Sequence, residues 1–148
     1  MMSRRNARPF ELLLVEDNLG DVRLMMEALS ETKWSRNLNV VEDGEQAMRY
    51  LRRQAPYDNA TRPDLILLDL NLPGKDGRQV LAEVKGERTL CTIPVIVLTT
   101  SRMQEDINQA YSLHANGYIA KPTDFASYSA MVEAIGQFWM GLACLPAI

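Results

Sequence analysis

Short apolar segments alternate with segments of helical periodicity five times along the chain, and this alternation limits the fold more than any other feature. The apolar segments are rich in Val, Ile and Leu on both faces, which is typical of buried parallel strands. They are Phe10–Val15, Leu38–Val41, Asp64–Asp69, Pro94–Thr99 and Gly117–Ala120. A β-strand followed by a helix, repeated five times, predicts an α/β fold with helices on both faces of a parallel sheet.

The order of the strands follows from the handedness of the connections. Because parallel crossovers are right-handed, five repeats favour a doubly wound, five-stranded sheet in the flavodoxin-like order 2-1-3-4-5. Asn18 and Asp21 predict the cap and first-turn acid of the first helix. Ser101 and Gln104 form a capping-box pattern that predicts the start of the fourth helix. The last helix is the longest, with an apolar stripe from Phe125 to Leu142.

The length of 148 residues suits one domain. We expect a flexible segment at residues 1–9, the domain at 10–142, a tail at 143–148, and a loop excursion at Gln54–Pro63. A net charge of −3 disfavours nucleic-acid binding. No segment approaches the roughly 20 apolar residues that span a bilayer. The sequence therefore predicts a cytoplasmic single domain, without a fused effector, that binds neither membrane nor nucleic acid.

Polar residues follow the ends of four predicted strands. Glu16 and Asp17 follow the first, Asp69 ends the third, Thr99 ends the fourth and Lys121 follows the fifth. In a doubly wound sheet these positions meet at the ligand-binding edge. Three adjacent carboxylates repel one another, and Mg²⁺ resolves the conflict because it binds carboxylates, waters and phosphate oxygens.

Each of these elements alone has an ordinary structural explanation. An acidic pair is more often a helix cap or a solvated loop, and a Lys-Pro pair is more often a surface turn. Their joint placement is difficult to obtain by chance. A carboxylate nucleophile with Mg²⁺, a hydroxyl and an ammonium is the set that phosphoryl transfer to an aspartate needs.

The motifs that carry these residues resemble the receiver domains of two-component response regulators, from about Phe10 to Phe138. The acidic pair lies in LLLVEDN, Asp69 in DLILLDLNLPGKDG, Thr99 in IPVIVLTT and Lys121 in GYIAKP. The resemblance implies that Asp69 accepts a phosphoryl group from a phosphohistidine of a partner sensor histidine kinase. It also implies a protein that is not an enzyme in its own right and that loses the phosphoryl group slowly.

The resemblance also implies roles for the other site residues. Asp17 and Asp69 are expected to bind Mg²⁺ directly, Asn71 through its backbone carbonyl, and Glu16 mostly through water. Lys121 is expected to pair with the phosphoryl group.

The expected switch involves the hydroxyl of Thr99, which moves toward the phosphoryl group while Tyr118 turns inward. Pro73 and Pro122 mark structural turns, and the resemblance implies a cis peptide before Pro122. Thr100 replaces the usual small residue, which is expected to narrow access to the phosphate and slow its loss. The spacing between Asp17 and Asp69 is longer than in the smallest receivers, and the loop Gln54–Pro63 is expected to contain the additional residues.

A narrower resemblance concerns EDNLGDVRL, RPDLILLDLNLPGKDGR and the closing QFW. These are similar to small regulators paired with bacterial, especially cyanobacterial, phytochromes, which implies a phytochrome as the kinase. The alternatives are a phosphate sink or a phosphorelay intermediate for another histidine kinase.

Two other classes compete with this interpretation. A phosphatase of the haloacid dehalogenase type needs a second Asp two residues after the nucleophile, where this chain has Asn71. A flavin carrier needs a phosphate-binding Gly/Ser/Thr loop after the first strand, which the sequence does not contain.

Large apolar residues near the end of the last helix predict an interface. They include Phe138, Trp139 and Leu142. We expect a homodimer or partner contact through the fourth helix, fifth strand and fifth helix.

Overall fold

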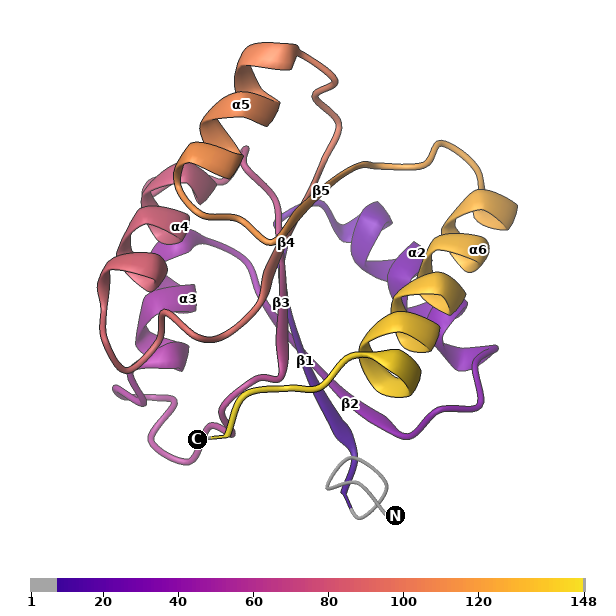
Figure 1. The fold of residues 1–148 in the computed structure, drawn as a ribbon, viewed down its shortest axis with the longest axis horizontal. Helices are drawn as coiled ribbons and strands as arrows, with labels where there is room; N and C mark the ends of the chain where they lie inside the picture. Colours follow the sequence, from indigo (N-terminus) through magenta and orange to yellow (C-terminus); the bar gives the residue numbers. More distant parts are fainter. Residues whose placement is uncertain (1–7, 148) are drawn as a thin grey trace.

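The computed structural model describes residues 8–147 and confirms the predicted fold class. Five parallel strands form one sheet in the order β2-β1-β3-β4-β5. Helices cover both faces: α3, α4 and α5 lie on one, and α2 and α6 on the other (Figure 1). The strands are β1 (Phe10–Val15), β2 (Arg36–Val41), β3 (Leu65–Leu68), β4 (Val95–Thr99) and β5 (Gly117–Ala120).

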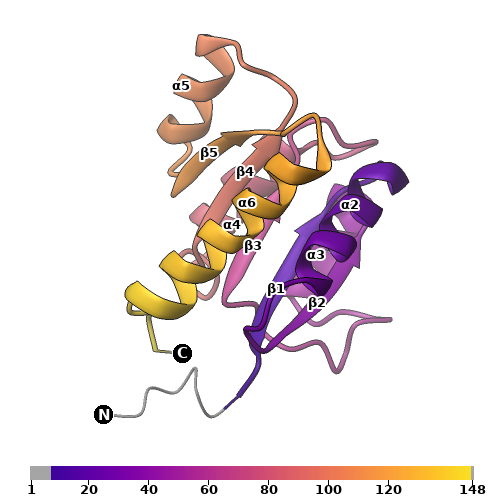
Figure 2. The same cartoon turned by 90° about the vertical axis from the view of Figure 1, so that its right-hand side faces the viewer.

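The central strands bury both of their faces because successive side chains alternate between two cores. In β1, Leu13 and Val15 belong to the core under α3 and α4, while Leu12 and Leu14 belong to the core under α2 and α6. Figure 2 shows α6 and α2 together on the second face. The sheet is therefore a rigid platform whose carboxyl ends present the side chains of the site.

The helices are α2 (Leu19–Ser30), α3 (Gly44–Leu51), α4 (Gly77–Gly86), α5 (Gln104–Ser112) and α6 (Phe125–Gly136), followed by the π-helical segment η1 (Gln137–Leu142). The predicted cap of α2 is confirmed, since Asn18 Oδ1 accepts a hydrogen bond from the Asp21 N–H at 3.0 Å. The longest predicted helix thus ends in a π-helical turn. No helix within residues 8–147 has the length and apolar character to cross a membrane.

The predicted start of α5 is wrong. The helix begins at Gln104 with Met103 as N-cap, and no side chain caps it. The hydroxyl of Ser101 instead donates to Asp106 Oδ2 at 2.5 Å and accepts from the Met103 N–H at 3.2 Å. This local bonding uses the capping hydroxyl outside the helix and keeps the preceding segment irregular.

The cis peptide expected before Pro122 is also not found. The cis peptide bond in the described part of the chain is Ala55–Pro56, within the predicted loop excursion. A trans bond is the ordinary state of an X-Pro peptide. The Lys121 N–H donates to the Thr99 carbonyl at 2.7 Å, so the β4–β5 pairing itself sets the position of the lysine.

The C-terminal segment returns across the sheet edge opposite the site (Figure 1). Leu145 packs on the core under α2 and α6. With Pro146 it also lines a small cavity beside Asp64 and Pro94, at the amino ends of β3 and β4. Residues 1–7 of the expected flexible segment lie outside the described residues, and the domain limits stay a prediction.

Candidate functional site

Three carboxylates gather at the carboxyl ends of β1 and β3, as the sequence predicts. Glu16 and Asp17 follow β1 and Asp69 follows β3, and one carboxylate oxygen from each lies within 4.8 Å of the others. Glu16 and Asp69 are buried, with exposed fractions of 2% and 5%, whereas Asp17 is exposed. The site is therefore a dense negative cluster that opens to solvent at Asp17.

Lys121 supplies positive charge to this cluster. Its Nζ lies 2.7 Å from Glu16 Oε1, 2.7 Å from Asp21 Oδ2 and 3.1 Å from Asp69 Oδ2. Burial works to lower the pKa of Lys121, but these carboxylates outweigh it and raise the pKa above its usual value. Lys121 is therefore a buried ammonium ion throughout the physiological pH range.

The pKa of Glu16 is raised in this arrangement. Burial is the largest cause that raises its pKa, and the charge of Asp69 adds to it, while the contact with Lys121 works in the opposite direction. The net result is a pKa of about 7. Without a further positive charge, the cluster therefore holds Glu16 close to protonation at neutral pH.

The donor set fits a hard divalent cation. Glu16, Asp17 and Asp69 offer oxygen ligands within 4.8 Å of one another, and a hard divalent cation binds such oxygens. Asn71 lies two residues after Asp69 and is exposed, with its N–H donating to Asp69 Oδ1 at 3.2 Å. This hydrogen bond holds the backbone of Asn71 beside the Asp69 carboxylate.

Thr99 is the last residue of β4, and the environment of its hydroxyl is unusual for a buried polar group. It is fully buried, and its hydroxyl has no hydrogen-bond partner among the described residues. Thr100 beside it is exposed. A buried hydroxyl without a partner is energetically costly, so an acceptor placed next to Thr99 would be stabilised by it. Tyr118 is partly buried, and its hydroxyl donates to the Ser101 carbonyl at 2.9 Å.

Sequence reasoning assigned Asp21 only to the first turn of α2, but the structure places it in the site. Its carboxylate contacts Lys121 across 100 residues of sequence. The available signal was weaker: Asp21 lies in the first turn of the helix that begins directly after the acidic pair, near the carboxyl end of β1.

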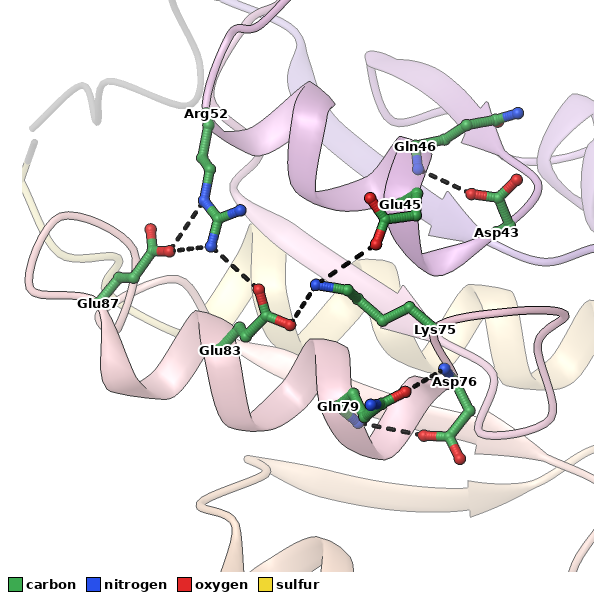
Figure 3. Close-up of polar contacts among 9 residues, drawn as sticks. All are labelled: Asp43, Glu45, Gln46, Arg52, Lys75, Asp76, Gln79, Glu83 and Glu87. Carbon is green, nitrogen blue, oxygen red and sulfur yellow. Dashed lines mark hydrogen bonds and ion pairs between the residues drawn. The ribbon is translucent and has the colours of Figure 1, made fainter.

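A glycine turn and several ion pairs fix the loop that connects Asp69 to α4. Gly74 has a φ of 67°, a conformation that favours glycine, directly after the predicted turn residue Pro73. Lys75 pairs with Glu83 of α4 and with Glu45 of α3, and Arg52 pairs with Glu83 and Glu87 (Figure 3). These contacts fix the loop to both helices.

The first residue of α4 packs against the backbone of the site. Asp76 forms a capping box with Gln79 (Figure 3). A Cβ on Gly77 would lie 2.1 Å from the Asp69 carbonyl oxygen, so only glycine fits there. The backbone of Asp69 is thus packed directly against the first residue of α4.

The predicted interface residues lie away from this cluster, in η1. Phe138 and Leu142 are exposed, with exposed fractions of 50% and 77%. Trp139 is partly buried against the core under α2 and α6, with its ring 5.0 Å from that of Phe138. Pro122 is partly buried directly after Lys121, and Pro73 is exposed in the loop before α4.

Comparison with known proteins gives consistent results. A family model described as the response regulator receiver domain matches residues 12–133. The response regulator Rcp1 of Synechocystis sp. is 45% identical over 146 residues, covering 99% of this chain and 99% of that protein.

Two solved structures are also similar. The phosphorylated cyanobacterial phytochrome response regulator RcpA is 49% identical, covering 94% of this chain and 99% of that chain, with a TM-score of 0.89. The Mn²⁺-bound form of Rcp1 is 46% identical, covering 94% of this chain and 100% of that chain, with a TM-score of 0.87. The sequence, the sheet order and the acidic site agree, and the chain belongs to the response regulator receiver domain family.

Proposed function

We propose that this protein accepts a phosphoryl group on Asp69 from a sensor histidine kinase in the cytoplasm, in a Mg²⁺-dependent reaction. The observation that carries the proposal is the position of Asp69, which is buried between Lys121 and the acidic pair. A carboxylate oxygen attacks the phosphorus of a phosphohistidine. The P–N bond breaks, the imidazole leaves with the bonding electrons, and an acyl phosphate forms on Asp69.

Glu16, Asp17, Asp69 and the Asn71 carbonyl are the residues proposed to hold Mg²⁺. When bound, the cation supplies positive charge that offsets the carboxylates and the incoming phosphoryl oxygens. Lys121 supplies a second positive charge at Asp69, where its Nζ already lies 3.1 Å from the carboxylate. The packing of Gly77 against Asp69 fixes the nucleophile for attack.

Thr99 and Tyr118 are proposed to convert phosphorylation into a conformational change. The buried hydroxyl of Thr99 gains a hydrogen-bond acceptor when a phosphoryl oxygen arrives, which favours the phosphorylated state. Tyr118 then leaves the Ser101 carbonyl and occupies the vacated space. Thr100, exposed beside the site, is proposed to restrict water and slow the loss of the phosphoryl group.

The proposed phosphoryl donor is a phytochrome histidine kinase. The support is the identity of 49% to RcpA, which is itself a phytochrome response regulator. The test is transfer from the autophosphorylated kinase, and separately from acetyl phosphate, to wild type and to Asp69→Asn, with and without Mg²⁺. Mg²⁺-dependent labelling of wild type alone by both donors supports the proposal.

The two donors separate the two parts of the proposal. Labelling by acetyl phosphate without transfer from the kinase would reject the phytochrome and keep the phosphoacceptor. Failure with both donors would reject the phosphoacceptor itself.

Homodimerisation through α5, β5 and α6 is proposed on the basis of the exposed apolar side chains there. Met103 and Tyr111 are exposed at α5, and Phe138 and Leu142 are exposed after α6. Leu142→Ser and Tyr111→Ser are expected to lower the sedimentation mass. Leu19→Ser, which removes an equally exposed apolar side chain on α2, is the matched control. An unchanged mass in all three variants would reject this interface.

A further inference from the structure

Asp21 contacts the lysine of the site from an element that carries none of the expected site residues. Its Oδ2 lies 2.7 Å from Lys121 Nζ, closer than Asp69 Oδ2 at 3.1 Å. Asp21 is in the first turn of α2, and its side chain is 24% exposed. The ammonium is therefore shared between α2 and the ends of the strands.

The ammonium of Lys121 donates hydrogen bonds to Asp21 and Asp69 and forms an ion pair with Glu16 in this state. An ammonium group has three N–H donors, and three carboxylates contact it in the described chain, from Glu16, Asp21 and Asp69. A phosphoryl group on Asp69 must draw the same ammonium toward its own oxygens. Asp21 competes for that ammonium, and its negative charge also repels the phosphoryl dianion.

The negative charge of Asp21, which repels a phosphoryl dianion, favours the binding of a divalent cation. Glu16, Asp17 and Asp69 form the carboxylate cluster, and Asp21 adds a fourth negative charge through its contact with Lys121, which also contacts Glu16 and Asp69. Removing the charge of Asp21 leaves the cluster less negative, and it allows Lys121 to bind Glu16 and Asp69 more strongly. Both effects disfavour a divalent cation at those carboxylates.

We propose that Asp21 is a positioning residue that holds Lys121 in the unphosphorylated state, favours the divalent cation and opposes the phosphoryl group. This inference rests on the proposed function, because it assigns Asp21 a role in the same phosphoryl-transfer site. Asp21 thereby sets how strongly the site retains a phosphoryl group once it is formed.

The test measures two affinities with opposite expected changes. Isothermal titration gives the affinity for Mg²⁺ alone, and then for beryllofluoride, an anionic mimic of the phosphoryl group, at saturating Mg²⁺. Asp21→Asn is expected to weaken Mg²⁺ binding and to tighten beryllofluoride binding, each by about 3- to 10-fold. Asp21→Glu keeps the charge and is expected to stay close to wild type.

Glu27→Gln is the matched control, since Glu27 is an exposed acid on the same helix. It is expected to change neither affinity. Local damage to the fold weakens both affinities together, so parallel losses in Asp21→Asn would overturn the inference, as would no change in either. If wild type binds neither Mg²⁺ nor beryllofluoride, the proposed function itself fails. Normal wild-type binding with an unaltered Asp21→Asn overturns only the role of Asp21.

Discussion

Lys121 Nζ lies 3.1 Å from Asp69 Oδ2, although 52 residues separate the two positions in the chain. The sheet order explains the contact, because β4 alone lies between β3 and β5, and each residue directly follows its strand. The contact places a buried positive charge on the carboxylate proposed as nucleophile. It also ties the fifth repeat of the fold to the third.

Gly77→Ala is expected to destabilise the protein by about 2–4 kcal/mol and to impair labelling of Asp69. The added Cβ would overlap the backbone of Asp69 and Leu70, which cannot move without shifting the nucleophile. Urea denaturation and acetyl phosphate labelling measure the two effects. Gly86→Ala at the other end of α4 has open space and is expected to stabilise by about 0.5–1 kcal/mol. Equal stability of the two variants would contradict the packing argument.

Thr99→Val is expected to stabilise the unphosphorylated protein by about 0.5–1 kcal/mol, because it removes a buried hydroxyl that has no hydrogen-bond partner within residues 8–147. Beryllofluoride is expected to raise the free energy of unfolding of the wild type, and Thr99→Val is expected to lose this stabilisation. Denaturation with and without beryllofluoride and Mg²⁺ measures both quantities. Thr100→Val, at an exposed position, serves as the control and should change stability by less than about 0.5 kcal/mol. A marked loss of stability in Thr99→Val would show that the hydroxyl has a partner.

The contribution of Glu16 to the stability of the metal-free protein is expected to fall as the pH rises from about 4.5 to about 7. Burial raises the pKa of Glu16 to about 7, so the folded state holds this proton more tightly than the unfolded state. The contribution is complete below the unfolded pKa and is lost as the pH passes the folded one, amounting to about 1–3 kcal/mol. The measurement is denaturation in EDTA at pH 5 and pH 8, compared with Glu16→Gln. Identical pH dependence of the two proteins would refute the assignment.

The sheet and the main site residues could be predicted because both follow from simple periodic rules. Strands apolar on both faces require cover on both sides, and parallel strands bring their carboxyl ends to one edge, so Asp17, Asp69 and Lys121 had to converge. The contact between Asp21 and Lys121 could not be predicted in this way. It depends on the rotation of α2 on the sheet, which the apolar pattern of a helix does not fix at the level of one side chain.

Local motifs failed where a side chain found another partner. Ser101 and Gln104 matched a capping box, yet the Ser101 hydroxyl binds Asp106 and the helix begins later. The π-helical end of α6 carries the same apolar residues as a regular helix, so periodicity did not distinguish them. The missing partner of Thr99 is a property of packing around one atom, which no sequence pattern reports.

The most direct test of the account is to locate the phosphoryl group. The protein is phosphorylated with acetyl phosphate and Mg²⁺, reduced with borohydride, which converts an aspartyl phosphate to homoserine, and mapped by peptide mass spectrometry. The account predicts homoserine at position 69 and no other modified carboxylate. Modification at Asp17 or Glu16 instead, or none under conditions where Mg²⁺ binds, would contradict the assignment of Asp69 as the phosphoacceptor.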